Sequence, residues 1–539
     1  MSVDVQGDEV VARRSDKPRL FRGLPVIVWA LCGLMLLSML NWSFTRAVFS
    51  AQDERAHVGA VLYLEEFREW PGFKEMPLML SVMRAAELMG IAPFLADDAV
   101  PRSDRPSFAE LTDPSNLVSG KSLNQMSQHP PLYYAGLAAV HRLVADAGLG
   151  FDLEIWLWRA LSALILCPLP LLAAALARRL GAGRRMTVLA AATIALLPSV
   201  QILGGAVNND NLLIAASGWV LLGMGCVLTG DLRVRTAVWI GLALAVALLT
   251  KAFAIPIAVG VAAAYLVVAV RTREVRRSLL AAAVVVAVAA LGGWWWVRNL
   301  LIYGAIQPNG HSAPLESGPL PFDEAWPIYW QTFVERFFTR YWLGANAPLV
   351  GPIEIAATIV LTILVVAGLV TMVVRARLTR SRLVDFAVLL VPIVLASAIV
   401  VYQSYRYTVV TGVAAGVQGR YLFPAALAAG VVFAVAADAA LKDRGQRILL
   451  AIGLGLGLFA TVWRVGVATQ SWEPDASSLW EHLSALYAWS PLPYPISIAI
   501  QLAWLATFVL VAVLGIREVR RPAESAQSSG SAALISSAR

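Results

Sequence analysis

The chain is divided into blocks of about twenty apolar residues, and this pattern limits its fold more than any other feature of the sequence. A membrane-spanning helix needs roughly 20 mostly apolar residues in a row. Of the 539 residues, 58% are hydrophobic and only 14% are charged, which is far from the composition of soluble domains. The sequence therefore predicts an all-α polytopic membrane protein.

Twelve segments meet the requirement for a span. They are residues 24–44, 155–177, 186–204, 211–230, 235–250, 252–270, 278–297, 352–374, 383–402, 420–440, 447–466 and 497–515. Basic residues precede the first segment, and no small-residue cleavage site follows it. We therefore expect this segment to be a retained signal anchor.

The distribution of arginine predicts how the chain crosses the membrane. Short connections such as 178–185, 271–277 and 375–382 carry four arginines each, and the rule that cytoplasmic loops are positive places them inside the cell. This predicts a protein of the cytoplasmic membrane whose N-terminal tail (1–23) and disordered C-terminal tail (516–539) both lie in the cytoplasm. The net charge of +8 then reflects membrane orientation, and we expect no nucleic-acid partner.

Four longer segments fall on the outer side under this topology. The outer segments 298–351 and 403–419 interrupt a core of spans over 155–440, and 467–496 joins the last two spans within 441–515. The longest, 45–154, includes an apolar stretch at 131–149 that contains His141, Arg142 and Asp146. A span there would place the basic connection 178–185 outside, so we expect interfacial amphipathic helices in this loop.

The first chemical motif, Asp53-Glu54-Arg55-Ala56-His57, comes shortly after the first span. A spacing of four residues places Asp53 and His57 on one helical face. A carboxylate in a membrane-bounded cleft can serve as a general base. The alternative is that the acids cap a helix and are stabilised by the positive N-terminal end of its dipole. Local sequence leaves both interpretations open.

Two further polar motifs lie on the outer side. His129 precedes Pro130-Pro131-Leu132-Tyr133-Tyr134, where the prolines suit a helix start and the tyrosines suit the lipid headgroup layer. Asp210 lies in Asn208-Asn209-Asp210-Asn211 between two spans. This run either forms a turn and helix cap or places Asp210 opposite Asp53 across an outward-facing cavity.

Three cations lie at the outer ends of spans, namely Lys251, Arg298 and Arg420. Each alone is explained by a long side chain that reaches toward the membrane surface, and together they could hold a lipid phosphate. The three cysteines lie in apolar blocks, and the chain has no phosphate-binding loop for ATP. The sequence indicates no metal ligand set and requires no cofactor, and it leaves a divalent cation open.

Taken in order, these motifs resemble the GT-C superfamily of membrane glycosyltransferases over about residues 25–440. The order is most similar to DUF2142-type and dolichyl-phosphate-mannose-protein-mannosyltransferase-like members. The resemblance implies an enzyme that transfers a sugar from a polyprenyl-phosphate donor to an envelope glycan, lipid or protein outside the membrane. Ala56 stands where relatives carry a histidine or arginine, and this departure leaves the acceptor class open.

The resemblance also implies roles for individual residues. Asp53 matches the catalytic acid of the first outer loop, with Glu54 beside it as the second catalytic candidate. The expected substrate-binding residues are His57, His129, Asp210, Lys251, Arg298 and Arg420. A single acid base predicts direct, inverting displacement with no metal or only a weak need for one.

Two other classes of protein compete with the enzyme. One is a polytopic transporter or a lipid or glycan flippase, although few ionisable residues fall within the spans and no inverted repeat is evident. The other is a lipid-binding scaffold without catalytic activity.

Overall fold

The computed structural model describes residues 20–89, 100–308, 315–344, 351–470, 472 and 477–522. Within these ranges ten helical segments are long and apolar enough to cross a membrane. They are α1 (Val26–Thr45), α6 with α7 (Phe151–Leu166 and Leu169–Arg179), α10 (Asp210–Leu228), α12 (Ile255–Thr272) with η4 (Ala252–Ala254), α13 (Val275–Tyr303), α15 (Pro352–Arg375), α16 (Arg380–Thr411), α17 (Phe423–Ala440) with η6 (Gly419–Leu422), α18 (Asp443–Gln470) and α20 (Tyr494–Arg520).

The other two predicted spans are helical but do not meet the same test. The segment 186–204 forms α8 (Arg184–Ala195) and α9 (Pro198–Gly204), which meet at an angle of 54°. Pro198 explains the break, because proline cannot donate a helical hydrogen bond and pushes the residue before it out of helical geometry. The segment 235–250 forms α11 (Val234–Leu248), with 15 residues. All twelve predicted segments are thus helical, whereas the described residues support ten spans, or eleven with the bent pair.

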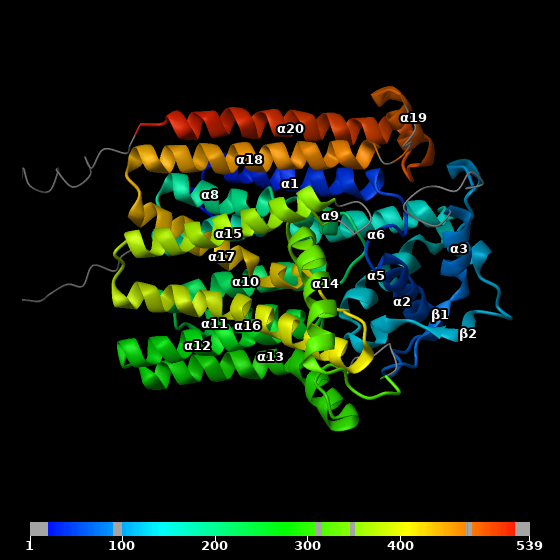
Figure 1. Cartoon of the computed structure of the whole chain (residues 1–539), viewed down its shortest axis with the longest axis horizontal. Coiled ribbons are helices and arrows are strands. Elements are labelled where there is room, and N and C mark those ends of the chain that lie inside the picture. Colours follow the sequence, from blue (N-terminus) through cyan, green and yellow to red (C-terminus); the bar gives the residue numbers. More distant parts are fainter. Residues whose placement is uncertain are drawn as a thin grey trace, which may run out of the picture.

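The long helices lie side by side along the longest axis of the molecule (Figure 1). Smaller elements gather at one end of this bundle, on the right in Figure 1, and α14 (Phe322–Trp342) crosses the ends of the long helices. The smaller elements are α2 (Glu54–Phe67), β1 (Pro77–Met79), α3 (Leu80–Met89), η1 (Arg102–Asp104), α4 (Phe108–Leu111), β2 (Val118–Leu123), η2 (Gln125–Gln128), α5 (Leu132–Val144), η3 (Ala145–Ala147) and α19 (Leu479–Trp489).

The bundle is built around α10. In its most apolar stretch 89% of the residues are buried inside the protein, whereas only 6% of the corresponding stretch of α15 is buried. A helix that exposes such an apolar surface needs a lipid environment, so α15 lies at the rim and α10 at the centre. Small residues allow close packing in the centre, as at Gly218, where an added Cβ would come within 2.9 Å of Leu169.

The elements at the end of the bundle share a second apolar core, which holds the first outer segment together. Val58 and Val61 of α2 pack with Tyr134 and Leu137 of α5 and with Phe151 at the start of α6. The 13 residues of α5 extend only about 20 Å at the usual helical rise, so α5 is too short to span and does not add to the count of crossings.

Two features of this end differ from the sequence-based expectations. Tyr133 and Tyr134 are 3% and 0% exposed, so they lie in the protein interior and not in a headgroup layer. The strands β1 and β2 form an antiparallel pair with Pro77 opposite Leu123, which the helical pattern of the sequence did not predict.

Candidate functional site

Asp53 lies at the N-cap position of α2, but its side chain does not cap the helix. Its backbone is left-handed, with φ +59°, a conformation that aspartate tolerates better than most residues other than glycine. The carboxylate Oδ2 instead accepts a hydrogen bond of 2.6 Å from Nη2 of Arg420. The capping interpretation of this side chain is therefore wrong, and its partner comes from a distant part of the chain.

Four charged side chains from four parts of the chain form one connected cluster. Arg420 of η6 bonds to Asp53, and its Nε lies 3.6 Å from Oδ2 of Asp210. The other oxygen of Asp210 accepts a hydrogen bond of 2.7 Å from Nζ of Lys251. Asp53 is the most exposed member, with 31% of its side chain accessible, whereas the other three side chains are at most 7% accessible. The structure thus places Asp210 opposite Asp53, with Arg420 between them.

A network of hydrogen bonds fixes Asp210 in this position. Oδ1 of Asn208 accepts a bond of 2.9 Å from the backbone N–H of Asp210. The backbone N–H of Asn208 in turn donates to the hydroxyl of Tyr133, at 3.0 Å. The run of asparagines is therefore a helix start, as one interpretation held, and it also aims Asp210 into the cluster.

Arg420 owes its position to the glycine before it. A Cβ on Gly419 would come within 2.2 Å of the backbone oxygen of Phe337, so only glycine lets η6 pack this closely against α14. The hydrogen bond from Nη1 of Arg340 to the oxygen of Val417, at 3.1 Å, ties α14 to the residues just before η6.

The two histidines lie beside the cluster and are uncharged at neutral pH. Nδ1 of His57 and the hydroxyl of Tyr134 are 3.0 Å apart, and burial lowers the pKa of His57 to about 4. Burial also holds the pKa of His129 well below its ordinary value. His129 lines the large cavity described below, and its backbone oxygen accepts a hydrogen bond from Trp70 at 3.0 Å.

Asp53 remains ionised at neutral pH. Burial acts to raise the pKa of its carboxyl group, but the cations Arg420 and Lys251 more than offset this effect. The pKa consequently lies below the ordinary value for aspartate.

Glu54, the second catalytic candidate, faces away from the cluster into the protein. Its oxygens accept hydrogen bonds from Nε and Nη2 of Arg159, at 2.7 and 2.5 Å, and both side chains are fully buried. The backbone N–H groups of Phe49 and Val207 also donate to it, each at 3.0 Å. Because all its acceptor positions are used, Glu54 holds α1, α2 and α6 together and has no free oxygen for a substrate.

Arg298 makes its contacts within its own helix. It lies on α13 with its guanidinium 5.2 Å from the ring centre of Trp295, and Nη1 is 3.3 Å from Oδ1 of Asn299. Because α13 continues to Tyr303, Arg298 is inside the helix and not at its end. These contacts are with residues of α13, and a role for Arg298 beside Lys251 and Arg420 stays a prediction.

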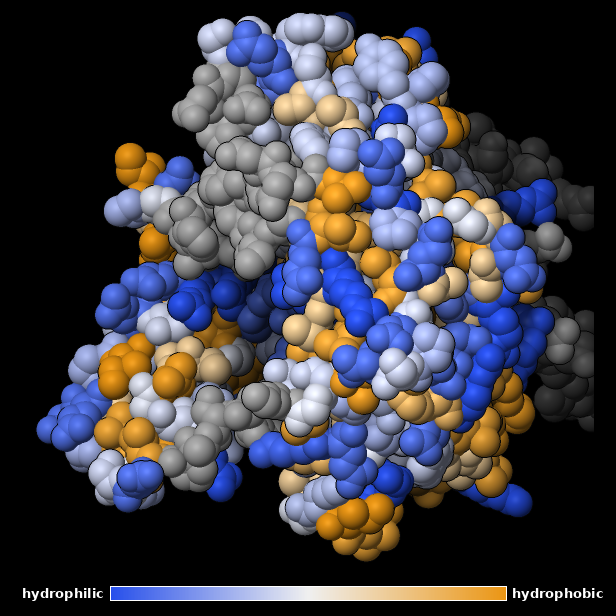
Figure 2. All heavy atoms as spheres, turned by 90° about the vertical axis from the view of Figure 1, so that its right-hand side faces the viewer, coloured by the Kyte–Doolittle hydropathy of each residue, from blue (hydrophilic) through white to orange (hydrophobic). Residues whose placement is uncertain are grey.

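A large cavity of about 590 Å³ opens beside Asp53. Figure 2 looks onto this end of the molecule, where hydrophilic and hydrophobic residues are mixed around a recess to the left of centre. Apolar side chains of α12, α16 and their neighbours form one part of the cavity wall, namely Phe253, Ile255, Ile306, Ile399 and Val400. Polar side chains line another part beside Asp53, among them Gln125, Gln128, His129, Lys251, Gln307, Gln403, Ser404 and Gln418.

Tyr421 connects the two parts of this wall. Its ring stacks on Phe253 with centres 4.6 Å apart, and Nζ of Lys251 lies 4.7 Å above it. Sequence analysis missed the glutamines, since separate amides scattered over several loops form no recognisable motif. Within the part of the chain that the structure describes, no three His, Cys, Asp or Glu side chains are placed to hold a metal ion.

A family model described as "Predicted membrane protein (DUF2142)" matches residues 36–429. No curated protein matches the chain.

Several solved structures are similar to this chain in the overall path of the backbone. ArnT from Cupriavidus metallidurans, bound to undecaprenyl phosphate, is 17% identical with a TM-score of 0.43, covering 90% of this chain and 76% of ArnT. The arabinosyltransferase EmbB from Mycobacterium smegmatis is 12% identical with a TM-score of 0.43, covering 94% of this chain and 43% of EmbB. The oligosaccharyltransferase AglB from Archaeoglobus fulgidus, with an inhibitory peptide and a dolichol-phosphate, is 14% identical with a TM-score of 0.36, covering 92% of this chain and 56% of AglB.

Proposed function

We propose that this chain, which belongs to the DUF2142 family of predicted membrane proteins, is a glycosyltransferase that uses a polyprenyl-phosphate sugar. One observation carries the proposal. Asp53 is an ionised carboxylate at the wall of an amphipathic cavity. Its side chain does not cap its own helix but accepts a hydrogen bond from Arg420, which is distant in the sequence. The order of the sequence motifs, which resembles GT-C glycosyltransferases, agrees with this interpretation.

The cavity suits a ligand that is apolar at one end and polar at the other. Its volume falls within the range of about 300–1,000 Å³ that is usual for ligand sites. The apolar wall between α12 and α16 would take the first isoprene units of the lipid, and the glutamine side chains would bind sugar hydroxyls. Lys251 would hold the phosphate between these two parts.

The reaction needs a base for the acceptor and a cation for the leaving group. Asp53 removes the proton from the acceptor hydroxyl as the hydroxyl oxygen attacks the anomeric carbon of the sugar. The bond from this carbon to the phosphate oxygen breaks, and its electron pair leaves with the polyprenyl phosphate. Lys251 and Arg420 stabilise the negative charge that develops on the phosphate.

Substrate binding would strengthen Asp53 as a base. A phosphate near Arg420 competes with Asp53 for its N–H groups, and the loss of that contact raises the pKa of the carboxyl group. Among the described residues that line the large cavity, Asp53 is the one carboxylate. A single base supports inversion at the anomeric carbon, since a retaining route uses two carboxyl groups about 5 Å apart.

The charges on the two ends of the bundle support a site on the outer face. The basic connections 178–185, 271–277 and 375–382 follow or precede helices at the end of the bundle opposite α2 and α5 (Figure 1). Positive loops favour the cytoplasmic side, so the cluster around Asp53 would face outward.

Complementation of a deletion strain tests this proposal. Deletion should remove a sugar from an envelope glycan, lipid or glycoprotein, and the wild-type gene should restore it. Asp53→Asn, present at the same level in the membrane, should fail to restore the sugar. The control is Asp113→Asn, an acid of the same outer segment whose side chain is 42% exposed, and it should restore the sugar fully.

The same strains separate the enzyme from a flippase. In permeabilised membranes a labelled polyprenyl-phosphate sugar reaches both faces, so a flippase defect disappears and a transferase defect persists. Full restoration by Asp53→Asn, or normal transfer in permeabilised deletion membranes, would overturn the proposal.

A further inference from the structure

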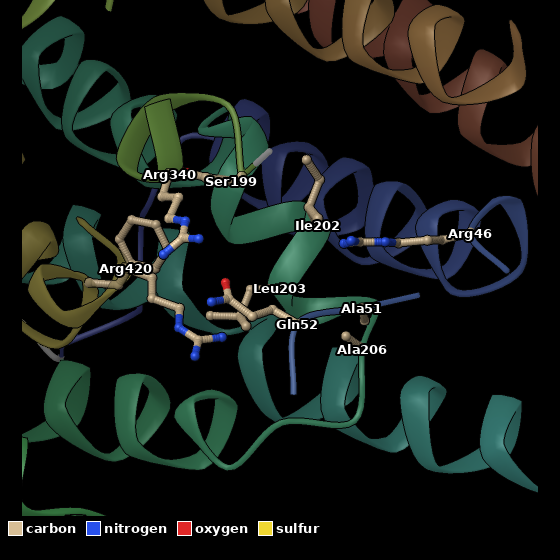
Figure 3. Close-up of a pocket in the computed structure, with 11 residues that line it drawn as sticks. Arg46, Ala51, Gln52, Ser199, Ile202, Leu203, Ala206, Arg340 and Arg420 are labelled. Atoms are coloured by element: carbon tan, nitrogen blue, oxygen red, sulfur yellow. The ribbon is translucent and has the colours of Figure 1, made fainter. Parts of the chain in front are cut away.

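A second, smaller cavity lies next to the charge cluster and contains three arginines. Arg46 follows α1, Arg340 belongs to α14 and Arg420 to η6, and all three line this space of about 30 Å³. Figure 3 shows Arg340 and Arg420 on one side of this space and Arg46 on the opposite side, with the side chain of Gln52 between the two sides. We call this space the arginine cavity. Its volume exceeds the roughly 10–15 Å³ that one water needs, so it can hold a few oxygen atoms.

The arginine cavity has an excess of positive charge. Among the described residues that line it, none is an aspartate or a glutamate. Burial lowers the pKa values of Arg46 and Arg340 to about 10; the neighbouring Arg336 and Arg420 add to the effect on Arg340, whereas Glu54 offsets part of the effect on Arg46. An anion among these arginines is favoured, because it offsets the penalty of their burial and the repulsion between Arg340 and Arg420.

Several N–H groups in the cavity also lack an acceptor. Arg46 donates through Nη2 to the oxygen of Ser50, and Arg340 through Nη1 to the oxygen of Val417. In contrast, Nε of Arg340 and Nη1 of Arg420 are buried and form no hydrogen bond with any described residue, whereas Nε of Arg420 faces Oδ2 of Asp210 at 3.6 Å. Arg420 is 94% buried, its overall exposure being 6%. Buried donors are nearly always paired in proteins, so these groups indicate a missing acceptor.

We propose that the arginine cavity binds an oxyanion of the phosphate class through Arg46, Arg340 and Arg420. Guanidinium groups match the oxygens of such an anion in pairs, which a single ammonium group cannot do. The inference rests on the proposed function, because the oxyanion belongs either to the acceptor or to the donor. Arg420 lines the arginine cavity and also bonds to Asp53, which lines the large cavity. An anion bound here therefore draws Arg420 away from the base.

Binding of inorganic phosphate to the purified full-length protein in detergent tests the site. Phosphate should raise the melting temperature in a saturable manner, while sodium chloride at the same ionic strength should not. Arg340→Gln should weaken the apparent affinity about ten- to a hundredfold, as expected for the loss of charge-assisted hydrogen bonds. Arg340→Lys keeps the charge but not the paired geometry, and it should lose part of the affinity.

The control variant is Arg142→Gln. Arg142 is an arginine of α5 whose side chain is 56% exposed, and it lies outside the residues that line the arginine cavity. It should bind phosphate as the wild type does. Equal phosphate affinity in Arg340→Gln, Arg142→Gln and wild type would overturn the proposal, as would a wild type that phosphate does not stabilise.

Competition with farnesyl phosphate, a short polyprenyl phosphate, identifies the source of the oxyanion. If the donor supplies it, saturating farnesyl phosphate should abolish the effect of inorganic phosphate. If the acceptor supplies it, both ligands should bind together and their stabilising effects should add. If inorganic phosphate stabilises the protein and farnesyl phosphate does not, the proposal of an oxyanion site stands. The proposal that the donor is a polyprenyl phosphate is then excluded.

Discussion

Replacement of Glu54 by glutamine should lower the stability of the folded protein. We expect this effect on stability although Glu54 directly follows the proposed catalytic base in the sequence. The carboxylate accepts four hydrogen bonds, two from Arg159 and two from backbone N–H groups. A glutamine has one acceptor oxygen, and its amide nitrogen would face donors. It also leaves the buried guanidinium of Arg159 without a counter-charge.

The size of this effect follows from the complete burial of the pair. Removing one partner of a buried ion pair is destabilising by about 3–5 kcal/mol. Because native proteins are stable by only about 5–15 kcal/mol, Glu54→Gln should lower the melting temperature by several degrees. Asp53→Asn is the matched variant, since 31% of the Asp53 side chain is accessible and its partner Arg420 keeps Asp210 as a second counter-charge. It should keep the melting temperature and lose about 10²–10⁴-fold in the rate of sugar transfer.

Thermal unfolding of the purified variants, together with sugar transfer in membranes, checks both statements. The double variant Glu54→Gln with Arg159→Met should be more stable than Glu54→Gln alone, because it removes the uncompensated charge. A variant Glu54→Gln with unchanged melting temperature and no transfer would refute the reasoning, since Glu54 would then be the reacting carboxylate.

Three other predictions concern the cluster and the topology. Gly419→Ala should displace Arg420 and reduce transfer, because the added methyl group would meet the backbone oxygen of Phe337; Gly455→Ala, where an added Cβ meets nothing within 4 Å, should not. Arg420→Gln should raise the pKa of Asp53, and the fall in kcat/KM on acidification should then begin at a higher pH; an unchanged profile would exclude Asp53 as the titrating base. Reporter fusions should show an outside location at residues 100, 320 and 480 and an inside location at 181, 274, 378 and 525, and an inside result at 100 would place the site in the wrong compartment.

Much of the fold could be predicted from the sequence because the relevant property is local. Apolar blocks of span length and the absence of charge within them are sufficient to locate helices in a membrane protein. Each predicted span is helical in the structure. The count differed because Pro198 bends one segment and because α11 is short, and hydropathy alone gives no information on such bends.

The sequence was less informative about the outer segments. The helix α14 lies within 298–351, which was expected to be an outer loop, and its aromatic residues pack against α16 and η6. The pair of strands β1 and β2 joins residues about forty positions apart. Neither feature has the regular pattern of apolar residues on which a prediction from sequence depends.

The sequence by itself determined the membrane-spanning helices, the charge asymmetry between their two ends and the positions of the acids and cations from which a site could form. Only the tertiary structure decided which of two adjacent acids is available to a substrate. Asp53 meets Arg420 across 367 positions of the chain, and Glu54 meets Arg159 across 105. Neighbouring residues of a helix point about 100° apart, so their surroundings depend on how α2 packs against other elements. Such packing is set by contacts between distant segments, and no local pattern in the sequence records them.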